Sequence, residues 1–216
     1  MFHFEYVSKQ EVQTYRNIFE EIIKAVQTQV RPEFTFQYKF IGSSERNMIT
    51  FDPTTSIGFD FDVNLYINDE NEDYSAKEIK LKLINAINMV ARPKGFNHCE
   101  DSTRVITLKM VNPLVSRIQY SCDFAIVNDY TDDDGIKHQQ YIRLNKNTGS
   151  YTWENQSNGY MLDSKIAWIK NQQLWNDVRE LYIWKKNNRI DLNKKSRALY
   201  AETIHEICQK SGFFEE

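Results

Sequence analysis

The spacing of apolar residues along the chain follows two different periods, and these periods predict the order of its elements. Over 8–30 and 75–90, apolar residues recur every three or four positions, which is typical of amphipathic helices. Each helix is predicted to begin at a Ser-x-x-Glu capping box, at Ser8 and at Ser75. Apolar and polar residues alternate, as in strands with one buried face, over 34–40, 57–67, 105–111 and 117–127.

After these strands the pattern changes. Residues 128–138 are rich in Asp and Asn and are predicted to form an acidic, turn-rich, solvated loop. A hairpin is predicted over 140–153, turning at Asn147-Thr148-Gly149. Helical periodicity then predicts two helices, over 163–186 and 192–210.

This order predicts an α+β fold: a mixed β-sheet with helices packed on one side, followed by a C-terminal helical pair. The chain has 216 residues, of which 41% are hydrophobic, so it is long enough to bury a full core and too short for two large domains. We expect the sheet and the N-terminal helix to form a core over 1–159 and the helical pair to occupy 160–216.

Charge and cysteine content exclude several classes of protein. The 27 basic and 30 acidic residues give a net charge of −3, so there is no global positive field for non-specific nucleic-acid binding. No apolar run approaches the length of a membrane-spanning helix and the first residues lack a signal-peptide pattern, so we expect a cytoplasmic protein with no membrane partner. Cys99, Cys122 and Cys208 are far apart, which favours reduced thiols over a disulfide framework or a zinc site.

Three aspartates lie within predicted strands, where Asp is disfavoured and needs a reason. Asp60 and Asp62 are two positions apart, so their side chains project from the same face of a strand, and Asp123 lies in the middle of a later strand. One explanation is an ordinary solvated sheet face. The other is a set of oxygen ligands for Mg²⁺, with Mn²⁺ as an alternative, that also binds phosphate oxygens.

The turn Gly42-Ser43-Ser44 at the end of the predicted strand 34–40 is compatible with the same chemistry. Gly lets the backbone approach a ligand closely, and amides and hydroxyls can bind the phosphates of a nucleoside triphosphate. An ordinary strand-to-loop turn is the alternative explanation.

The order of a Gly-Ser turn, an Asp-x-Asp strand and a single Asp on a later strand resembles the DNA polymerase beta-like nucleotidyltransferase superfamily, over about 36–127. The resemblance implies a nucleotidyltransferase-like sheet and a Mg²⁺-dependent enzyme. Such an enzyme transfers a nucleoside monophosphate from a triphosphate, such as ATP, to an acceptor hydroxyl, releases pyrophosphate and uses two metal ions. The implied phosphate-binding pair is Gly42 and Ser43, and the implied catalytic and metal-binding residues are Asp60, Asp62 and Asp123.

The turn sequence and the spacing of the motifs indicate which branch of the superfamily the chain resembles. Arg46 lies where the minimal nucleotidyltransferases of bacterial toxin–antitoxin pairs carry an Arg in a Gly-Ser-x-x-Arg-Gly turn, but Asn47 replaces the final Gly. The 18 positions from Gly42 to Asp60 are more similar to the oligoadenylate synthase-like branch, which includes the bacterial cyclic-oligonucleotide synthases. That branch carries a sizeable helical domain after the core, whereas 57 residues follow Gly159 here.

The short C-terminal part leaves the second substrate open. The acceptor is either a small molecule, a protein or an RNA, and a second copy of the chain or a partner subunit could supply a missing wall of the site. The basic helices over 165–210 are predicted to be a solvated face, with Lys165 or Lys185–Lys186 as candidates to neutralise a triphosphate. Tyr151 or Trp153 either packs or stacks on a base.

Two further hypotheses remain beside the enzyme. The chain could be a catalytically degenerate member of the same fold that binds a nucleotide or a partner protein without turnover. It could also belong to a toxin–antitoxin or anti-phage module.

Overall fold

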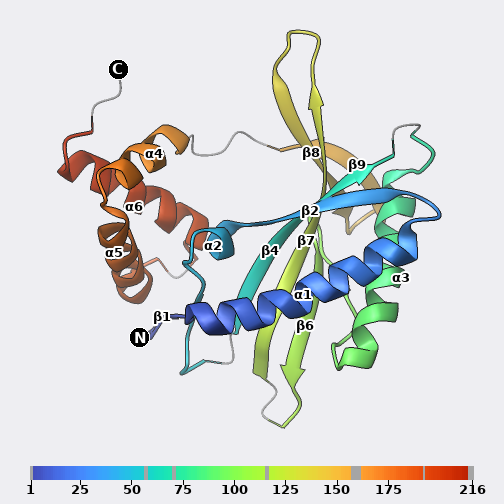
Figure 1. Cartoon of the computed structure of the whole chain (residues 1–216), viewed down its shortest axis with the longest axis horizontal. Coiled ribbons are helices and arrows are strands. Elements are labelled where there is room, and N and C mark those ends of the chain that lie inside the picture. Colours follow the sequence, from blue (N-terminus) through green and yellow to red (C-terminus); the bar gives the residue numbers. More distant parts are fainter. Residues whose placement is uncertain are drawn as a thin grey trace. The chain divides into compact units, whose positions relative to one another are not determined.

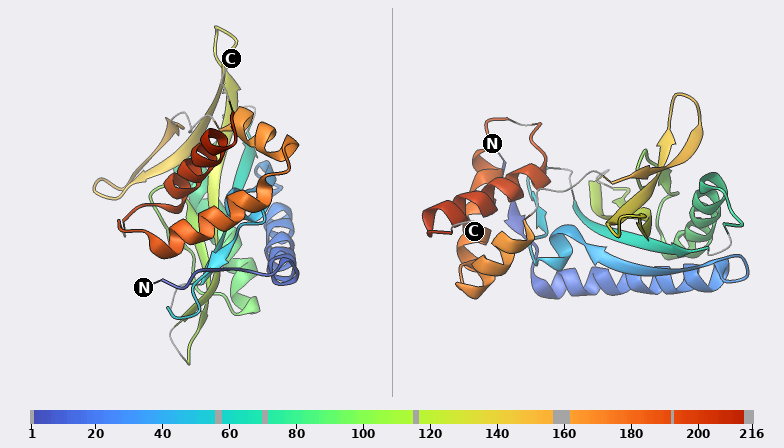
Figure 2. Two further views of the ribbon diagram at one scale, coloured as in Figure 1. Left: turned by 90° about the vertical axis from the view of Figure 1, so that its left-hand side faces the viewer. Right: turned by 90° about the horizontal axis from the view of Figure 1, so that it is seen from above.

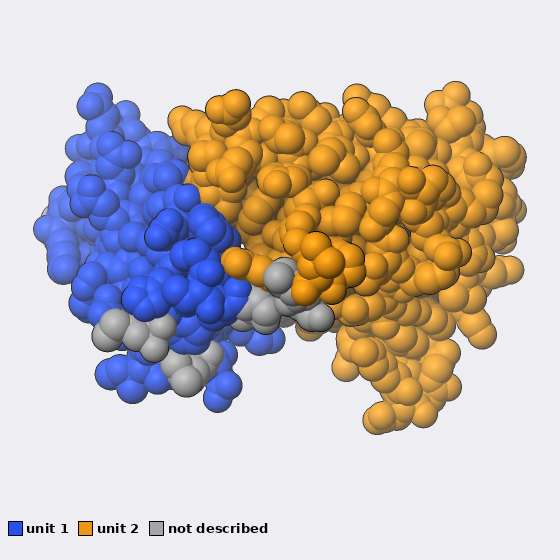
Figure 3. Space-filling view, turned by 90° about the horizontal axis from the view of Figure 1, so that it is seen from below, with its two compact units in different colours: residues 1–6, 50–55, 157–216 blue, residues 7–49, 56–156 orange. Residues whose placement is uncertain are grey.

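The computed structural model describes residues 2–55, 58–69, 72–114, 117–156, 162–191 and 193–213. They form two compact units, shown in different colours in Figure 3. We call 7–49 with 56–156 the sheet unit and 1–6 with 50–55 and 157–216 the helical unit. The predicted boundary at 159 and 160, residue 57 of a predicted strand and residue 192 of a predicted helix lie outside the described residues.

The sheet unit contains a seven-stranded mixed sheet with the order β2-β4-β7-β6-β5, and β8 pairs with both β7 and β9 (Figure 1). The pair β4–β7 is parallel, and the other pairs are antiparallel. The strands are β2 (Thr35–Ile41), β4 (Phe59–Asn68), β5 (Glu100–Asp101), β6 (Ile106–Asn112), β7 (Arg117–Thr131), β8 (Lys137–Asn145) and β9 (Ser150–Asn155).

Two helices pack on the apolar face of this sheet, α1 (Lys9–Val30) and α3 (Ala76–Ala91). The right-hand view of Figure 2 shows α1 running along the sheet. Both helices begin at the predicted capping boxes, because the side chains of Ser8 and Ser75 accept from the backbone N–H groups of Glu11 and Glu78. The predicted mixed sheet with helices on one side is therefore confirmed.

The core of the sheet unit is aromatic. Phe61 of β4 is fully buried, and its ring centroid lies 5.4 Å from that of Phe19 and 5.9 Å from that of Phe40. These contacts join α1, β2 and β4 on the apolar face of the sheet. A short 3-10 helix, η1 (Arg92–Lys94), follows α3, and Gly95 ends it at φ 89°.

The predicted acidic loop over 128–138 is wrong for most of its length. Strand β7 continues to Thr131 and β8 begins at Lys137, so only a tight turn remains between them. Asp132 explains this turn, because its Oδ1 accepts from the N–H groups of Asp134 (3.1 Å) and Ile136 (2.8 Å). Its Oδ2 lies 2.6 Å from His138 Nε2, which joins the two strands across the turn.

The helical unit contains three helices: α4 (Asp163–Asn171), α5 (Trp175–Asn188) and α6 (Ser196–Lys210). The single helix predicted over 163–186 is wrong, since it is divided into α4 and α5. Gln173 adopts φ 61°, in the left-handed region, and Leu174 donates its N–H to the Ile169 carbonyl at 3.0 Å, which ends α4. No helix among the described residues is both long and apolar enough to span a bilayer.

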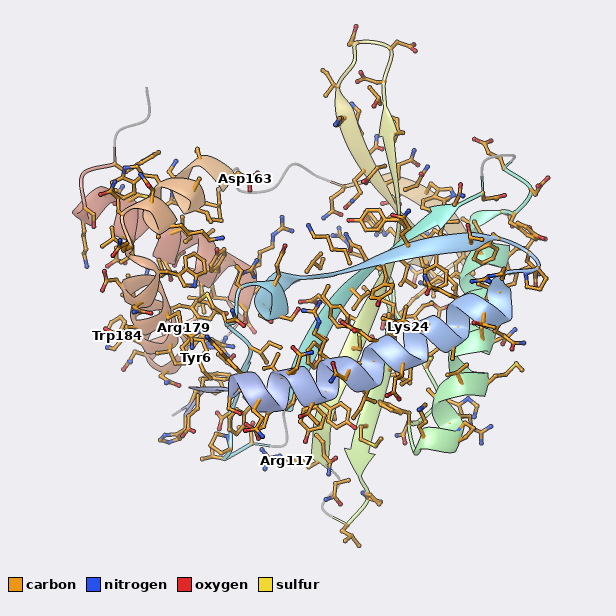
Figure 4. All side chains as sticks on the ribbon, viewed as in Figure 1. Tyr6, Lys24, Arg117, Asp163, Arg179 and Trp184 are labelled. Atoms are coloured by element: carbon orange, nitrogen blue, oxygen red, sulfur yellow. The ribbon has the colours of Figure 1, made fainter. Side chains whose placement is uncertain are left out.

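Segments from three distant parts of the chain meet in the helical unit. Strand β1 (Glu5–Tyr6) pairs with β3 (Thr50–Phe51). Phe4 exchanges two hydrogen bonds with the Asn187 side chain, at 2.6 and 3.0 Å. The Tyr6 hydroxyl donates to the Arg179 carbonyl at 2.7 Å, and Figure 4 shows these two residues side by side. The first residues of the chain are thus fixed to α5 by specific polar contacts.

One short helix of the sheet unit completes the fold and bears on the site. The residues Gly42-Ser43-Ser44, predicted as a turn, begin the four-residue helix α2 (Gly42–Glu45) directly after β2.

Candidate functional site

The strand register brings the predicted aspartates together on one face of the sheet. In the parallel pair β4–β7, Asp62 lies beside Asp123 and Asp60 lies beside Ser121. Residues paired in this way project from the same face, so the three carboxylates share it. The intervening Phe61 projects from the opposite face, into the core below α1. The strand pairing therefore confirms the prediction that Asp60 and Asp62 lie on the polar face of the sheet.

Two hydroxyl groups donate hydrogen bonds to the carboxylates of Asp60 and Asp123. The Ser121 hydroxyl donates to Asp60 Oδ1, and the Thr107 hydroxyl of β6 donates to Asp123 Oδ1 at 2.6 Å. Among the described residues, no group of three or more His, Cys, Asp or Glu side chains is arranged to hold a metal ion. The hydroxyl groups of Ser121 and Thr107 thus bind one oxygen each of Asp60 and Asp123.

The electrostatics of the site disfavour two adjacent negative charges. Burial and the charge of Asp123 raise the pKa of Asp62 to about 6, although the Arg46 guanidinium works in the opposite direction. Burial also raises the pKa of Asp123, against the Thr107 hydrogen bond and the charge of Lys109, which lower it. A divalent cation would offset this repulsion, and carboxylate oxygens are the ligands that Mg²⁺ prefers. The donor set therefore fits such an ion in its chemistry.

Gly42 lies directly against Asp62. It adopts φ 69°, a left-handed conformation, and a Cβ at this position would overlap Asp62 Oδ2. The absence of a side chain at Gly42 lets the start of α2 approach the carboxylate. The structure thus brings the predicted Gly-Ser turn to the Asp-x-Asp strand, which sequence order alone left open.

Ser44 has a role within this turn. Its side chain is buried, and its hydroxyl donates to the Ile41 carbonyl at 2.9 Å. Ser43 accepts the Met48 N–H on its carbonyl at 2.9 Å, and its own side chain is half-buried. Ser44 therefore stabilises the turn, whereas Ser43 keeps part of its surface accessible, and the contact of either hydroxyl with a phosphate stays a prediction.

The backbone conformation of Asn47 explains why Asn can replace the final Gly of the Gly-Ser-x-x-Arg-Gly pattern. This residue adopts φ 54°, the left-handed conformation that Gly adopts most easily and that Asn tolerates better than most residues. The backbone therefore keeps a conformation that suits Gly. Arg46 immediately precedes it and is close enough to Asp62 to lower the pKa of that carboxyl.

Lys165 belongs to the helical unit, on α4. Its ammonium group lies 5.5 Å from the centroid of the Phe213 ring, beside a shallow pocket of about 340 Å³. Its contact with a triphosphate stays a prediction.

Three residues of the site were missed by the sequence analysis: Ser121, Thr107 and Lys109. Lys109 pairs opposite Ser121 across β6–β7 and forms an ion pair with Glu100 at 2.6 Å. The alternation along β7 could have found Ser121, because residues two positions apart, such as Ser121 and Asp123, project from the same face. Thr107 and Lys109 depend on the register of β6, which no local pattern encodes.

The comparisons with known proteins come from structure alone. No protein-family model matches the chain, and no curated protein matches its sequence. The fold is similar to the Vibrio cholerae cyclic AMP-GMP synthase DncV, described as a prokaryotic cGAS homolog, with a TM-score of 0.62, 11% identity and coverage of 97% of this chain and 70% of that chain. It is also similar to the CdnE c-di-GMP synthase of Capnocytophaga granulosa, with a TM-score of 0.59, 16% identity and coverage of 95% and 62%.

A third similar structure is the CdnE cyclic dinucleotide synthase of Elizabethkingia meningoseptica, solved with GTP and Apcpp (TM-score 0.52, 12% identity, coverage 92% and 75%). The chain therefore has the fold of these cyclic dinucleotide synthases, in agreement with the mixed sheet that the sequence predicted. It spans 62% to 75% of the length of these three chains.

Proposed function

We propose that the protein is a Mg²⁺-dependent nucleotidyltransferase that transfers a nucleoside monophosphate from a triphosphate to an acceptor hydroxyl and releases pyrophosphate. The observation that carries this proposal is the register that pairs Asp62 with Asp123, with Gly42 against Asp62. The fold supports it, since solved structures of this fold include nucleotide complexes. Asp60, Asp62 and Asp123 are the proposed ligands, with Mn²⁺ as a possible substitute ion.

The proposed roles of the chain's own residues follow from their positions. Bound Mg²⁺ would supply positive charge that neutralises the triphosphate and the developing charge on the transferred phosphoryl group. The backbone amides at Gly42 and Ser43 contact phosphate oxygens, because Gly42 has no side chain that would keep the backbone away from a ligand. Arg46 adds positive charge beside Asp62. Asp123, deprotonated, accepts the proton of the acceptor hydroxyl or orients it.

A second nucleotide is the acceptor class that the comparisons favour. The Vibrio cholerae synthase was captured with the linear intermediate 5' pppA(3',5')pG, in which one nucleotide is joined to the hydroxyl of another. The present chain covers 70% of that chain, so the proposal is limited to the first bond between two nucleotides and does not include a second bond that would close the ring. A protein or an RNA acceptor remains an alternative product for the assay to detect.

The test is a pyrophosphate-release assay with each α-³²P-labelled nucleoside triphosphate, in Mg²⁺ and in Mn²⁺, followed by chromatography of the labelled products. We expect release of pyrophosphate from at least one triphosphate, and phosphatase-resistant label in the product. Asp123→Asn should lower the rate by at least about 10³-fold, because it removes a ligand and the acceptor's proton acceptor.

The matched control is Asp129→Asn, on the same strand. Asp129 is exposed and accepts from the Gln139 side chain at 2.7 Å, so its loss should leave the rate unchanged. Activity retained in Asp123→Asn, or lost equally in both variants, would contradict the proposed roles.

One observation favours a second candidate function, nucleotide binding without turnover. Asp60 and Asp123 are held by Ser121 and Thr107, and no metal-competent group is arranged among the described side chains. Calorimetric titration with the triphosphates, with and without Mg²⁺, separates the two functions. Binding without any release of pyrophosphate supports this candidate.

A further inference from the structure

A second concave surface of the sheet unit lies away from the carboxylates. It is a groove of about 610 Å³ between the start of α3 and the strands β7, β8 and β9, at the end of β4. Its apolar walls include Ile67, Tyr74 and Ile79, and the half-buried Trp153 provides an aromatic surface. A groove of this size with an aromatic wall can hold a small ring system.

The groove opens on the face of the sheet opposite the carboxylates. Asn128 lies two residues after Ile126 on β7, so both side chains project from the same face, and Gln140 pairs with Asn128. Ile126 is buried in the core beside Leu65, on the face covered by the helices. Asp123 lies three residues from Ile126 and projects from the other face. A ligand in the groove would therefore not compete with the proposed catalytic site.

Three polar groups of the groove are available to a ligand. Within the part of the chain that the structure describes, the amides of Asn128 and Gln140 and the indole N–H of Trp153 have no hydrogen-bond partner in the protein. Each amide offers a donor and an acceptor side by side, the pattern that matches the edge of a purine or pyrimidine base. The indole adds one donor.

The charge of the groove selects against phosphate. Asp69 and Glu72 contribute to its lining, and the lining residues that the structure describes include no Lys, Arg or His. The carboxylate of Asp69 accepts from the N–H groups of Asp73 (3.1 Å) and Tyr74 (3.0 Å), which fixes its negative charge at the groove. A nucleotide phosphate would be repelled here, whereas an uncharged base would not.

We propose that this groove binds an uncharged purine or pyrimidine, as the free base or the nucleoside. The ring stacks on Trp153, and the amides of Asn128 and Gln140 bind its edge. The site is distinct from the one that holds the triphosphate in the proposed function, so the two proposals can fail separately.

The test is isothermal titration calorimetry of the full chain, in EDTA, with adenosine, guanosine, cytidine and uridine at millimolar concentration. We expect at least one nucleoside to bind. Gln140→Leu should weaken this binding about fivefold, through the loss of a hydrogen bond, and Trp153→Ala by more than about fivefold, through the loss of stacking. ATP at the same concentration should not displace the nucleoside.

The matched control is Gln139→Leu, the same substitution one position earlier on β8. Gln139 projects from the other face of the strand and donates to Asp129, so its variant should bind the nucleoside as the wild-type protein does. The proposal is overturned if none of the four nucleosides binds. It is equally overturned if Gln140→Leu binds like Gln139→Leu, or if ATP displaces the nucleoside. Circular dichroism of each variant verifies that it is folded, and Gln140→Leu decides the matter if Trp153→Ala is not.

Discussion

The two faces of the central sheet are built by different rules, although their residues alternate one by one along the same strands. Phe61 and Cys122 face the helices and are fully buried, and packing fixes their positions. Asp62 and Asp123, each one residue further along, face the other way and sit side by side only because β4 and β7 pair in one register. Stability is thus concentrated on one face and the candidate chemistry on the other.

The largest effect should come from the buried face. Phe61→Ala removes a ring that contacts Phe19, Phe40 and Phe59, and we expect it to lower the free energy of unfolding by about 3–5 kcal/mol. Asp62→Ala, at the next position, should lower the free energy of unfolding by no more than about 1 kcal/mol, because it also removes a buried charge beside Asp123. Urea unfolding of both variants, without metal, measures the difference. Equal losses of stability in the two variants would contradict the conclusion that stability is concentrated on the buried face of the sheet.

The pH dependence of stability sharpens the contrast. Burial and the charge of Asp123 raise the pKa of Asp62 from 3.8 to about 6 in the folded chain. The folded state therefore holds the proton longer than the unfolded state, and stability is lost as the pH rises from 3.8 through 6. Asp62→Asn removes this penalty, so it should raise the free energy of unfolding by about 1–3 kcal/mol at pH 8.

The gain from Asp62→Asn should disappear near pH 4, where the wild-type carboxyl is protonated in the folded state. Unfolding experiments in EDTA across this range measure it. A gain that is the same at both pH values would mean that charge at Asp62 is not its cause. Added Mg²⁺ should stabilise the wild-type protein and not Asp62→Asn, if the carboxylates bind the ion.

These two faces also mark how far the sequence could predict the structure. Alternation within a single strand is a local property, so it placed Asp60 and Asp62 on one face and Phe61 on the other. The capping boxes at Ser8 and Ser75 are equally local, and both helices begin there. The aspartates were found because Asp is disfavoured within a strand, and their order after the Gly-Ser turn resembles a known superfamily.

What the sequence could not supply is the pairing of distant segments. The contact of Thr107 with Asp123 depends on how β6 aligns with β7. The pairing of β1 with β3 depends on contacts between residues more than forty positions apart. The break between α4 and α5 was missed for another reason, since Gln173 adopts a left-handed conformation that its own side chain does not favour. Surrounding packing overrides propensity at that point.

Gly42 offers a test at the border between the turn and the polar face. Gly42→Ala and Gly149→Ala both place a side chain at φ 69°, but only at Gly42 does the new Cβ overlap Asp62 Oδ2. We expect Gly149→Ala to cost about 1 kcal/mol of stability and Gly42→Ala about 1 kcal/mol more, because Asp62 has to rotate away. Chemical unfolding gives both values. If the two variants lose the same stability, the close approach of α2 to Asp62 is wrong.

The smallest expected effect lies in the hydroxyl that holds Asp123. The Thr107 hydroxyl donates to Asp123 Oδ1, which favours the ionised carboxyl and lowers its pKa against the effect of burial. Thr107→Val keeps the shape of the side chain and removes this donor, so the pKa of Asp123 should rise further above its ordinary value. Carboxyl ¹³C chemical shifts followed across pH, in EDTA, measure the change directly and do not depend on any activity. Thr107→Ser restores the donor and should restore the titration, whereas a purely structural role for Thr107 would leave the titration of Asp123 the same in all three proteins.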